Sequence, residues 1–100
     1  MNMSYPIKQK DVIWRRVGDT IVVIKEDGLS SHILNKTAAF IWELCDGTLD
    51  TGEIAERMQE RFEVSPELAK SDAEKIINEL TRAGIMNTAK GTRIGLGDGL

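Results

Sequence analysis

The sequence predicts a small α+β domain in which a three-stranded antiparallel sheet is followed by a three-helix bundle. Two observations lead to this prediction. The first third of the chain contains short runs rich in β-branched residues, separated by glycine turns. The middle repeats apolar residues every three or four positions, as helices do. The arrangement is winged-helix-like, with the strands placed first, and 100 residues leave room for one core.

Three strands are predicted in the first third of the chain, at residues 12–17, 20–26 and 29–34. Gly18 and Asp19 separate the first two runs, and Asp27 and Gly28 separate the second from the third. An Asp-Gly pair between apolar runs favours a hairpin, because glycine takes the positive φ that the turn needs. The middle strand of this meander is apolar on both faces. Helices are expected to cover one face, and Trp14 or a partner is expected to shelter part of the other.

Three helices are predicted, each from a start signal and an apolar stripe. Their expected N-caps are Asn35, Asp50 and Ser65. Glu53 follows Asp50 at capping-box spacing, and Pro66 takes the first helical position after Ser65. The buried stripes are expected at Ala38, Ile41, Trp42 and Cys45; at Ile54, Ala55, Met58 and Phe62; and at Ala69, Ala73, Ile76, Ile77 and Leu80. Gly47 and Gly84 are expected to end the first and third helices.

The predicted domain spans residues 12–86. Its last two residues, Ile85 and Met86, are expected to pack beneath the helices. Residues 1–11 are expected to form an N-terminal arm. Residues 87–100 contain four glycines and little periodicity, which indicates a flexible C-terminal tail.

The overall composition restricts the classes of partner. The chain has 13 basic and 16 acidic residues and a formal charge of −3, so charge gives no reason to expect nucleic acid or an anionic membrane as the main partner. No segment approaches the roughly 20 apolar residues of a membrane span. The N-terminus lacks the apolar run of a signal peptide, and a single cysteine suits a reducing compartment. A cytoplasmic protein is therefore expected.

Residues suited to catalysis are scarce. One cysteine and one histidine cannot supply the three or four clustered ligands of a typical metal site. Cys45 lies on an apolar helical stripe, where an inert buried thiol is the more common outcome. His32 lies on the third predicted strand, where contact with a ligand is a better interpretation than a catalytic base. No enzyme activity, no cofactor and no metal site are therefore expected.

A series of short motifs resembles one protein family. The motifs are Leu34-Asn35, Ile41-Trp42, Cys45-Asp46-Gly47, Glu53-Ile54-Ala55, Asp72 and the segment from Leu80 to Met86. In this order and spacing, over about residues 12–86, the chain resembles the PqqD family. Its members are the small proteins of pyrroloquinoline quinone (PQQ) biosynthesis, together with relatives that recognise the precursors of ribosomally made, modified peptides (RiPPs).

The resemblance implies a non-catalytic peptide chaperone. The leader segment of a precursor would add as a strand beside the third strand, contact the third helix, and be presented to a modifying enzyme, often a radical SAM protein. An edge strand of a meander has unpaired backbone groups that suit this role. The candidate peptide-binding residues are Leu29, Ser30, Ser31, His32, Ile33 and Leu34 on the strand, and Asp72, Lys75, Ile76, Glu79 and Leu80 on the helix. For the helix residues, a purely core or solvent-facing role is left open, and so is the choice between PQQ synthesis and another peptide pathway.

Two other functions remain open at this point. The first is a winged-helix nucleic-acid-binding regulator, but the predicted third helix, residues 65–84, contains four acidic and three basic residues, which is a poor match to phosphates. A basic group near the N-terminus, Lys8, Lys10, Arg15 and Arg16, keeps this alternative open. The second is a structural subunit that dimerises through the outer face of the sheet. A monomer or weak dimer is expected.

Overall fold

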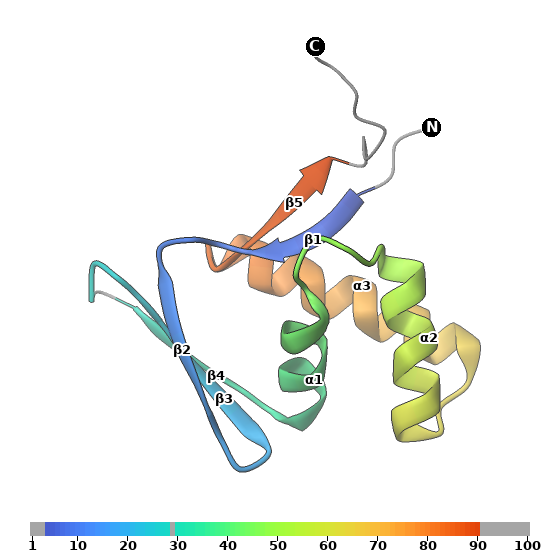
Figure 1. The fold of residues 1–100 in the computed structure, drawn as a ribbon. Coiled ribbons are helices and arrows are strands. Elements are labelled where there is room, and N and C mark those ends of the chain that lie inside the picture. The colour runs from blue at the N-terminus through green and yellow to red at the C-terminus, as the bar shows by residue number, and fades with distance from the viewer. Residues whose placement is uncertain (1–3, 29, 91–100) are drawn as a thin grey trace.

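The computed structural model describes residues 4–28 and 30–90, which form two small sheets and three helices (Figure 1). The elements are β1 (Ser4–Lys8), β2 (Val12–Val17), β3 (Thr20–Lys25), β4 (Ser31–Leu34), α1 (Lys36–Leu44), α2 (Thr51–Phe62), α3 (Pro66–Arg82) and β5 (Met86–Lys90). The sheet of β2, β3 and β4 lies on one side of α1 and the α2–α3 pair lies on the other (Figure 1). Strands β1 and β5 run across one end of the helices (Figure 1).

The predicted three-stranded antiparallel sheet is confirmed. β3 is its central strand, and Val23 pairs with Trp14 of β2 and His32 of β4. Ile21 and Val23 of β3 are fully buried because α1 packs on this inner face. The third strand is shorter than predicted, since it begins at Ser31, after the turn that follows β3.

The three helix starts agree with the sequence prediction. The Asn35 side chain accepts a hydrogen bond from the Ala38 N–H at 2.9 Å. Asp50 and Glu53 form the complete capping box that begins α2. The Ser65 hydroxyl accepts from the N–H of a first-turn residue of α3. Each cap satisfies a backbone donor that the helix itself leaves without a partner, which is why these local signals were sufficient.

The end of α3 also follows the prediction. Gly84 has φ +82°, its N–H donates to the Thr81 carbonyl, and the Ile85 N–H donates to the Leu80 carbonyl. This pair of bonds is a Schellman motif, which requires the left-handed conformation that glycine adopts most easily. Lys25 of β3 donates to the Gly84 carbonyl at 3.2 Å. The bond joins the C-terminal end of α3 to the sheet.

Gly47 does not end α1, and that prediction was wrong. The helix ends at Leu44, and the N–H of Cys45 caps it by donating to the Trp42 carbonyl. Gly47 lies two residues further on with φ +88°, and its N–H donates to a carbonyl of β1. A Cβ at this position would lie 3.1 Å from the Ile7 Cδ1 atom. Glycine is needed here because the loop approaches β1 closely.

The sequence did not predict β1 or β5. Residues 4–8 lie in the expected arm and residues 87–90 in the expected tail, yet they pair as antiparallel strands, with Ile7 opposite Asn87. Ile85 and Met86 are buried beneath the helices, as predicted. Residues 91–100 of the expected tail lie outside the described residues.

A single apolar core joins the sheet to the helices. Trp42 of α1 lies within it with no exposed surface, and its ring meets the Trp14 ring edge-to-face at 6.1 Å between centroids. The Lys8 ammonium group lies over both rings, at 5.5 and 5.6 Å from their centroids. Among the described helices, none has the length and apolar character needed to cross a membrane.

Candidate peptide-binding site

β4 is an edge strand of the three-stranded sheet, and β3 is its neighbour on one side only. Its four residues pair antiparallel with β3, from Ile24 opposite Ser31 to Ile21 opposite Leu34. An edge of this kind presents backbone N–H and C=O groups that another strand can use. Whether they are available depends on which residues turn these groups outward.

The hydrogen bonds of the adjoining turn establish which β4 groups point outward. The Lys25 N–H donates to the Ser30 carbonyl at 3.2 Å, so these two residues form a hydrogen-bonded pair. Such pairs alternate along an antiparallel ladder, so His32 and Leu34 direct their backbone groups toward β3. The N–H and C=O groups of Ser31 and Ile33 therefore point to the open edge. The sequence contained no signal for this alternation.

The side chains of the edge lie on two different faces. Leu34 is buried and His32 is half-buried on the inner face, beneath the helices, while Ser31 and Ile33 are exposed on the outer face. The His32 Nε2 atom is buried without a hydrogen-bond partner among the described residues. Ser30 is half-buried just before the strand, and Leu29 lies outside the described residues.

The candidate residues of α3 divide between its core flank and its solvent face. Leu80 is buried in the same apolar cluster as Leu34, and Ile76 packs against that cluster. Asp72, one turn before Ile76, is half-buried. Lys75 and Glu79 are exposed and line a shallow outward hollow of 430 Å³. Ile76 and Leu80 thus share an apolar core with Leu34 at the end of β4. Lys75 lies on the solvent side of α3.

The structure assigns Cys45 to the core. The residue is buried, and this burial raises the pKa of its thiol to about 12. Lys8 opposes this shift only in part, because its ammonium group favours the thiolate. Among the described residues, no group of three His, Cys or carboxylate side chains is arranged to hold a metal ion.

We expect the Cys45 thiol to resist modification in the folded protein. With a pKa of about 12, only roughly one molecule in ten thousand would be a thiolate at pH 8, and the thiolate is the reactive form. A colorimetric thiol reagent should therefore react within minutes in 6 M guanidinium chloride and not measurably in buffer. Rapid reaction of the folded protein would show that Cys45 is accessible.

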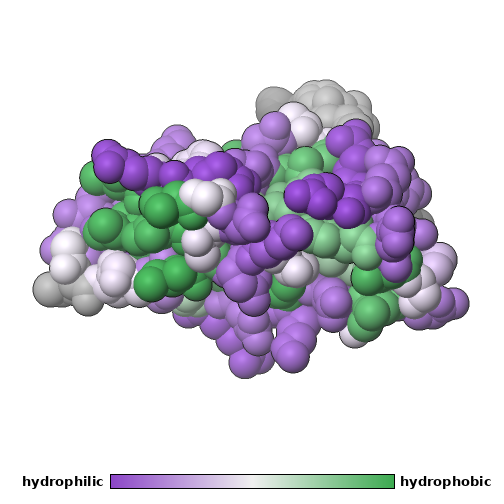
Figure 2. Space-filling view, turned by 90° about the horizontal axis from the view of Figure 1, so that it is seen from below, coloured by the Kyte–Doolittle hydropathy of each residue, from purple (hydrophilic) through white to green (hydrophobic). Residues whose placement is uncertain are grey.

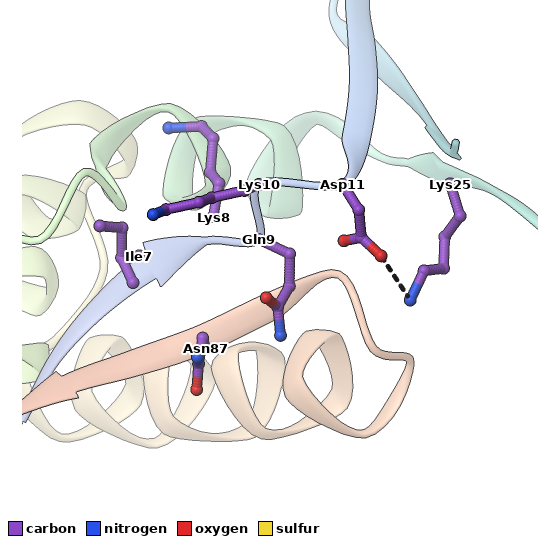
Figure 3. Close-up of a pocket in the computed structure, with 7 residues that line it drawn as sticks. All are labelled: Ile7, Lys8, Gln9, Lys10, Asp11, Lys25 and Asn87. Carbon is purple, nitrogen blue, oxygen red and sulfur yellow. Dashed lines mark ion pairs between the residues drawn. The ribbon is translucent and has the colours of Figure 1, made fainter. Parts of the chain in front are cut away.

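A second hollow lies where β1 passes into β2 and contains three lysines (Figure 3). Its volume is 390 Å³, and its lining includes Lys8, Lys10 and Lys25. Lys25 pairs with Asp11 at 3.4 Å, while the Lys8 amine points away toward α1 and donates to the Cys45 carbonyl (Figure 3). The three amines therefore do not converge on one point, and the arrangement does not form an anion site.

Two comparisons with known proteins bear on this geometry. The sequence pattern of the family described as "Coenzyme PQQ synthesis protein D (PqqD)" matches residues 20–86. A solved structure of TbiB1 in complex with the TbiA(beta) leader peptide has the same fold, with a TM-score of 0.73 and 16% sequence identity. The match covers 92% of this chain and 99% of that one. No curated protein matches the chain in sequence. The family pattern extends over most of the sheet and all three helices, and the chain therefore belongs to the PqqD family.

Proposed function

We propose that this chain binds the leader segment of a ribosomally made precursor peptide by strand addition to β4. It then presents the precursor to a modifying enzyme, in PQQ synthesis or a related pathway, without catalysing a reaction itself. The observation that carries the proposal is the open edge of β4, where Ser31 and Ile33 direct their backbone groups outward. Membership of the PqqD family and the fold shared with a leader-peptide complex support it.

The geometry of the β4 edge sets how many main-chain hydrogen bonds a bound leader can form. Ser31 and Ile33 each offer one N–H and one C=O, so an added strand would form up to four main-chain hydrogen bonds. Main-chain bonds set the register but carry little sequence information, so side chains must supply specificity. Alternate leader residues would face the helices beside Leu34 and the half-buried flank of α3 at Asp72 and Ile76. A leader with apolar residues at every second position fits this edge.

The resemblance also suggests the setting of this function. The modifying enzyme would be a radical SAM protein or another tailoring enzyme, and the domain would act in the cytoplasm, where precursors are translated. No cofactor is needed for a role that consists of binding and presenting a peptide.

An NMR titration tests the proposed binding mode. The ¹⁵N-labelled protein is titrated with synthetic leader segments of the short precursors encoded beside it. We expect the largest amide shifts at Ser31 and Ile33, because their N–H groups gain new acceptors, and smaller shifts along the Asp72–Leu80 flank of α3. Amide exchange at Ser31 and Ile33 should slow as these bonds form.

Two results would contradict the proposal. If no neighbouring precursor binds, the function is wrong. If the shifts instead centre on Val12, Trp14 and Arg16, the leader adds to β2, the other edge of the sheet. Their N–H groups point outward by the same alternation, since the Glu26 N–H donates to the Asp11 carbonyl at 2.8 Å.

A further inference from the structure

The outer face of the three-stranded sheet is a second apolar surface of this domain. We define the outer face as Ile13, Arg15 and Val17 of β2, Val22 and Ile24 of β3, and Ile33 of β4. The exposed fractions are 62% for Ile13, 57% for Val17, 41% for Ile24 and 75% for Ile33. Figure 2 shows hydrophobic side chains gathered over the sheet side of the molecule. Exposed apolar side chains that adjoin one another in this way mark interaction sites more often than isolated ones do.

This surface is continuous with the proposed leader site. Ile33 lies on the outer face, although its backbone groups point to the open edge of β4. A strand added at that edge would place every second side chain on the outer face, directly beside Ile33. Any protein resting on the outer face would then contact the domain and the bound leader together.

Arg15 gives the outer face a defined charge. It lies between Ile13 and Val17 on β2 and forms no ion pair among the described residues. The neighbouring Arg16 lies on the opposite face, where it pairs with Glu43 of α1 at 2.9 Å. A partner suited to the outer face therefore has an apolar surface with a carboxylate placed opposite Arg15.

The size of the outer face argues against a second copy of this chain as its occupant. Two strands of six residues and one of four cover roughly 250 Å² of the sheet plane, given a strand spacing of about 4.8 Å and a rise of about 3.3 Å per residue. A stable protein interface buries about 800 Å² on each partner. The outer face by itself is therefore too small for a stable interface. A partner that also contacts the bound leader would bury the missing area.

We infer that the outer face is the docking surface for the modifying enzyme, through an apolar, acidic patch of that enzyme, and that the bound leader completes the surface. This inference rests on the proposed function. It has two measurable consequences. The leader-bound domain should bind the enzyme more tightly than the free domain does, and changes on the outer face should weaken enzyme binding without affecting leader binding.

The test uses the purified enzyme and the synthetic leader encoded beside this chain. The variant I13T/I24T removes a cross-strand apolar pair but keeps β-branched side chains, which favour strands. Leu68→Thr is the matched control, because Leu68 is 48% exposed on α3, away from the outer face. Arg15→Glu tests the charge, with Lys70→Glu on α3 as its control. Affinities for leader and enzyme are measured by calorimetry on the full chain.

We expect I13T/I24T and Arg15→Glu each to weaken enzyme binding by about tenfold or more, the range of an interface hot spot. Both variants should keep the wild-type leader affinity, and both controls should bind the enzyme normally.

Unchanged enzyme affinity in I13T/I24T would overturn the inference, as would a wild-type domain that binds the leader but not the enzyme. Sedimentation showing a wild-type dimer that I13T/I24T dissociates, with enzyme affinity unchanged, would assign the face to a second copy instead. A wild-type domain that binds no leader would overturn the proposed function itself.

Discussion

Replacing Ser31 by proline is expected to weaken leader binding by at least about tenfold while leaving the domain folded. The Ser31 N–H points to the open edge of β4, so its loss breaks no bond with β3. Ser31 is also the first residue of β4, a position where strands tolerate proline. In the complex, however, proline removes a donor and leaves a leader carbonyl without a partner, which costs about 1–3 kcal/mol. The proline ring also occupies the space of the added strand, so we expect affinity to fall by at least about tenfold.

The neighbouring position provides the sharpest comparison. The His32 N–H points to Val23 of β3, so proline at His32 breaks the sheet itself. We expect His32→Pro to lower the free energy of unfolding by about 2–3 kcal/mol, whereas Ser31→Pro should lower it by less than about 1 kcal/mol. Ser31→Ala retains the N–H and should bind the leader normally.

Calorimetric titration with the leader and urea denaturation of each variant give both quantities. Wild-type affinity in Ser31→Pro would show that the leader does not pair with this edge. A loss of stability in Ser31→Pro as large as that in His32→Pro would show that the hydrogen-bond alternation along β4 is assigned the wrong way round.

The helices could be predicted closely because their signals are local. The reciprocal bonds of Asp50 and Glu53 join residues three positions apart, and the Schellman motif at Gly84 uses bonds that close within one turn. The sheet was predicted for a similar reason, since each hairpin joins adjacent runs through a short turn. In each case the interacting residues are close to one another in the sequence.

The pairing of β1 with β5 could not be predicted because it joins the two ends of the folded chain. Ile7 lies opposite Asn87; Pro6 argues against a strand in the first segment, and the second has no run of alternating apolar residues. The role of Gly47 was misassigned for the same reason, since the close approach to Ile7 is a tertiary contact. In the sequence alone, a glycine soon after a helical stripe favours a helix stop.

The candidate site was predictable as an edge strand but not in its orientation. A meander of three strands implies that the third is an edge, and the structure bears this out. Sequence periodicity could not show that the backbone N–H and C=O groups of Ile33 point to the open edge of β4. Nor could it show that the Ile33 side chain lies on the outer face of the sheet. For α3, helical period placed Ile76 and Leu80 on one buried stripe, but only the packed structure shows that Leu80 is buried and Ile76 half-buried.

Replacing Trp42 by alanine is expected to cause the largest loss of stability of any single change considered for this domain. Its side chain is the largest of those that are fully buried, and it packs against Trp14 of β2 and beneath the Lys8 ammonium group. Truncating a buried Trp to Ala typically costs about 3–5 kcal/mol, since the cavity left behind does not close completely. Small domains have only about 5–15 kcal/mol in total, so Trp42→Ala should be unfolded in a substantial fraction at 37 °C.

Trp42→Phe separates the effect of volume from that of the indole N–H. The Trp42 Nε1 atom has no hydrogen-bond partner among the described residues, so phenylalanine gives up ring volume but no hydrogen bond. We expect Trp42→Phe to lose about half as much stability as Trp42→Ala in urea denaturation, with Trp14 fluorescence as the probe. Because Trp42 is fully buried on α1, its folded variants should bind the leader with wild-type affinity. A Trp42→Phe protein that is fully folded yet fails to bind the leader would show that this residue shapes the β4 edge as well as the core.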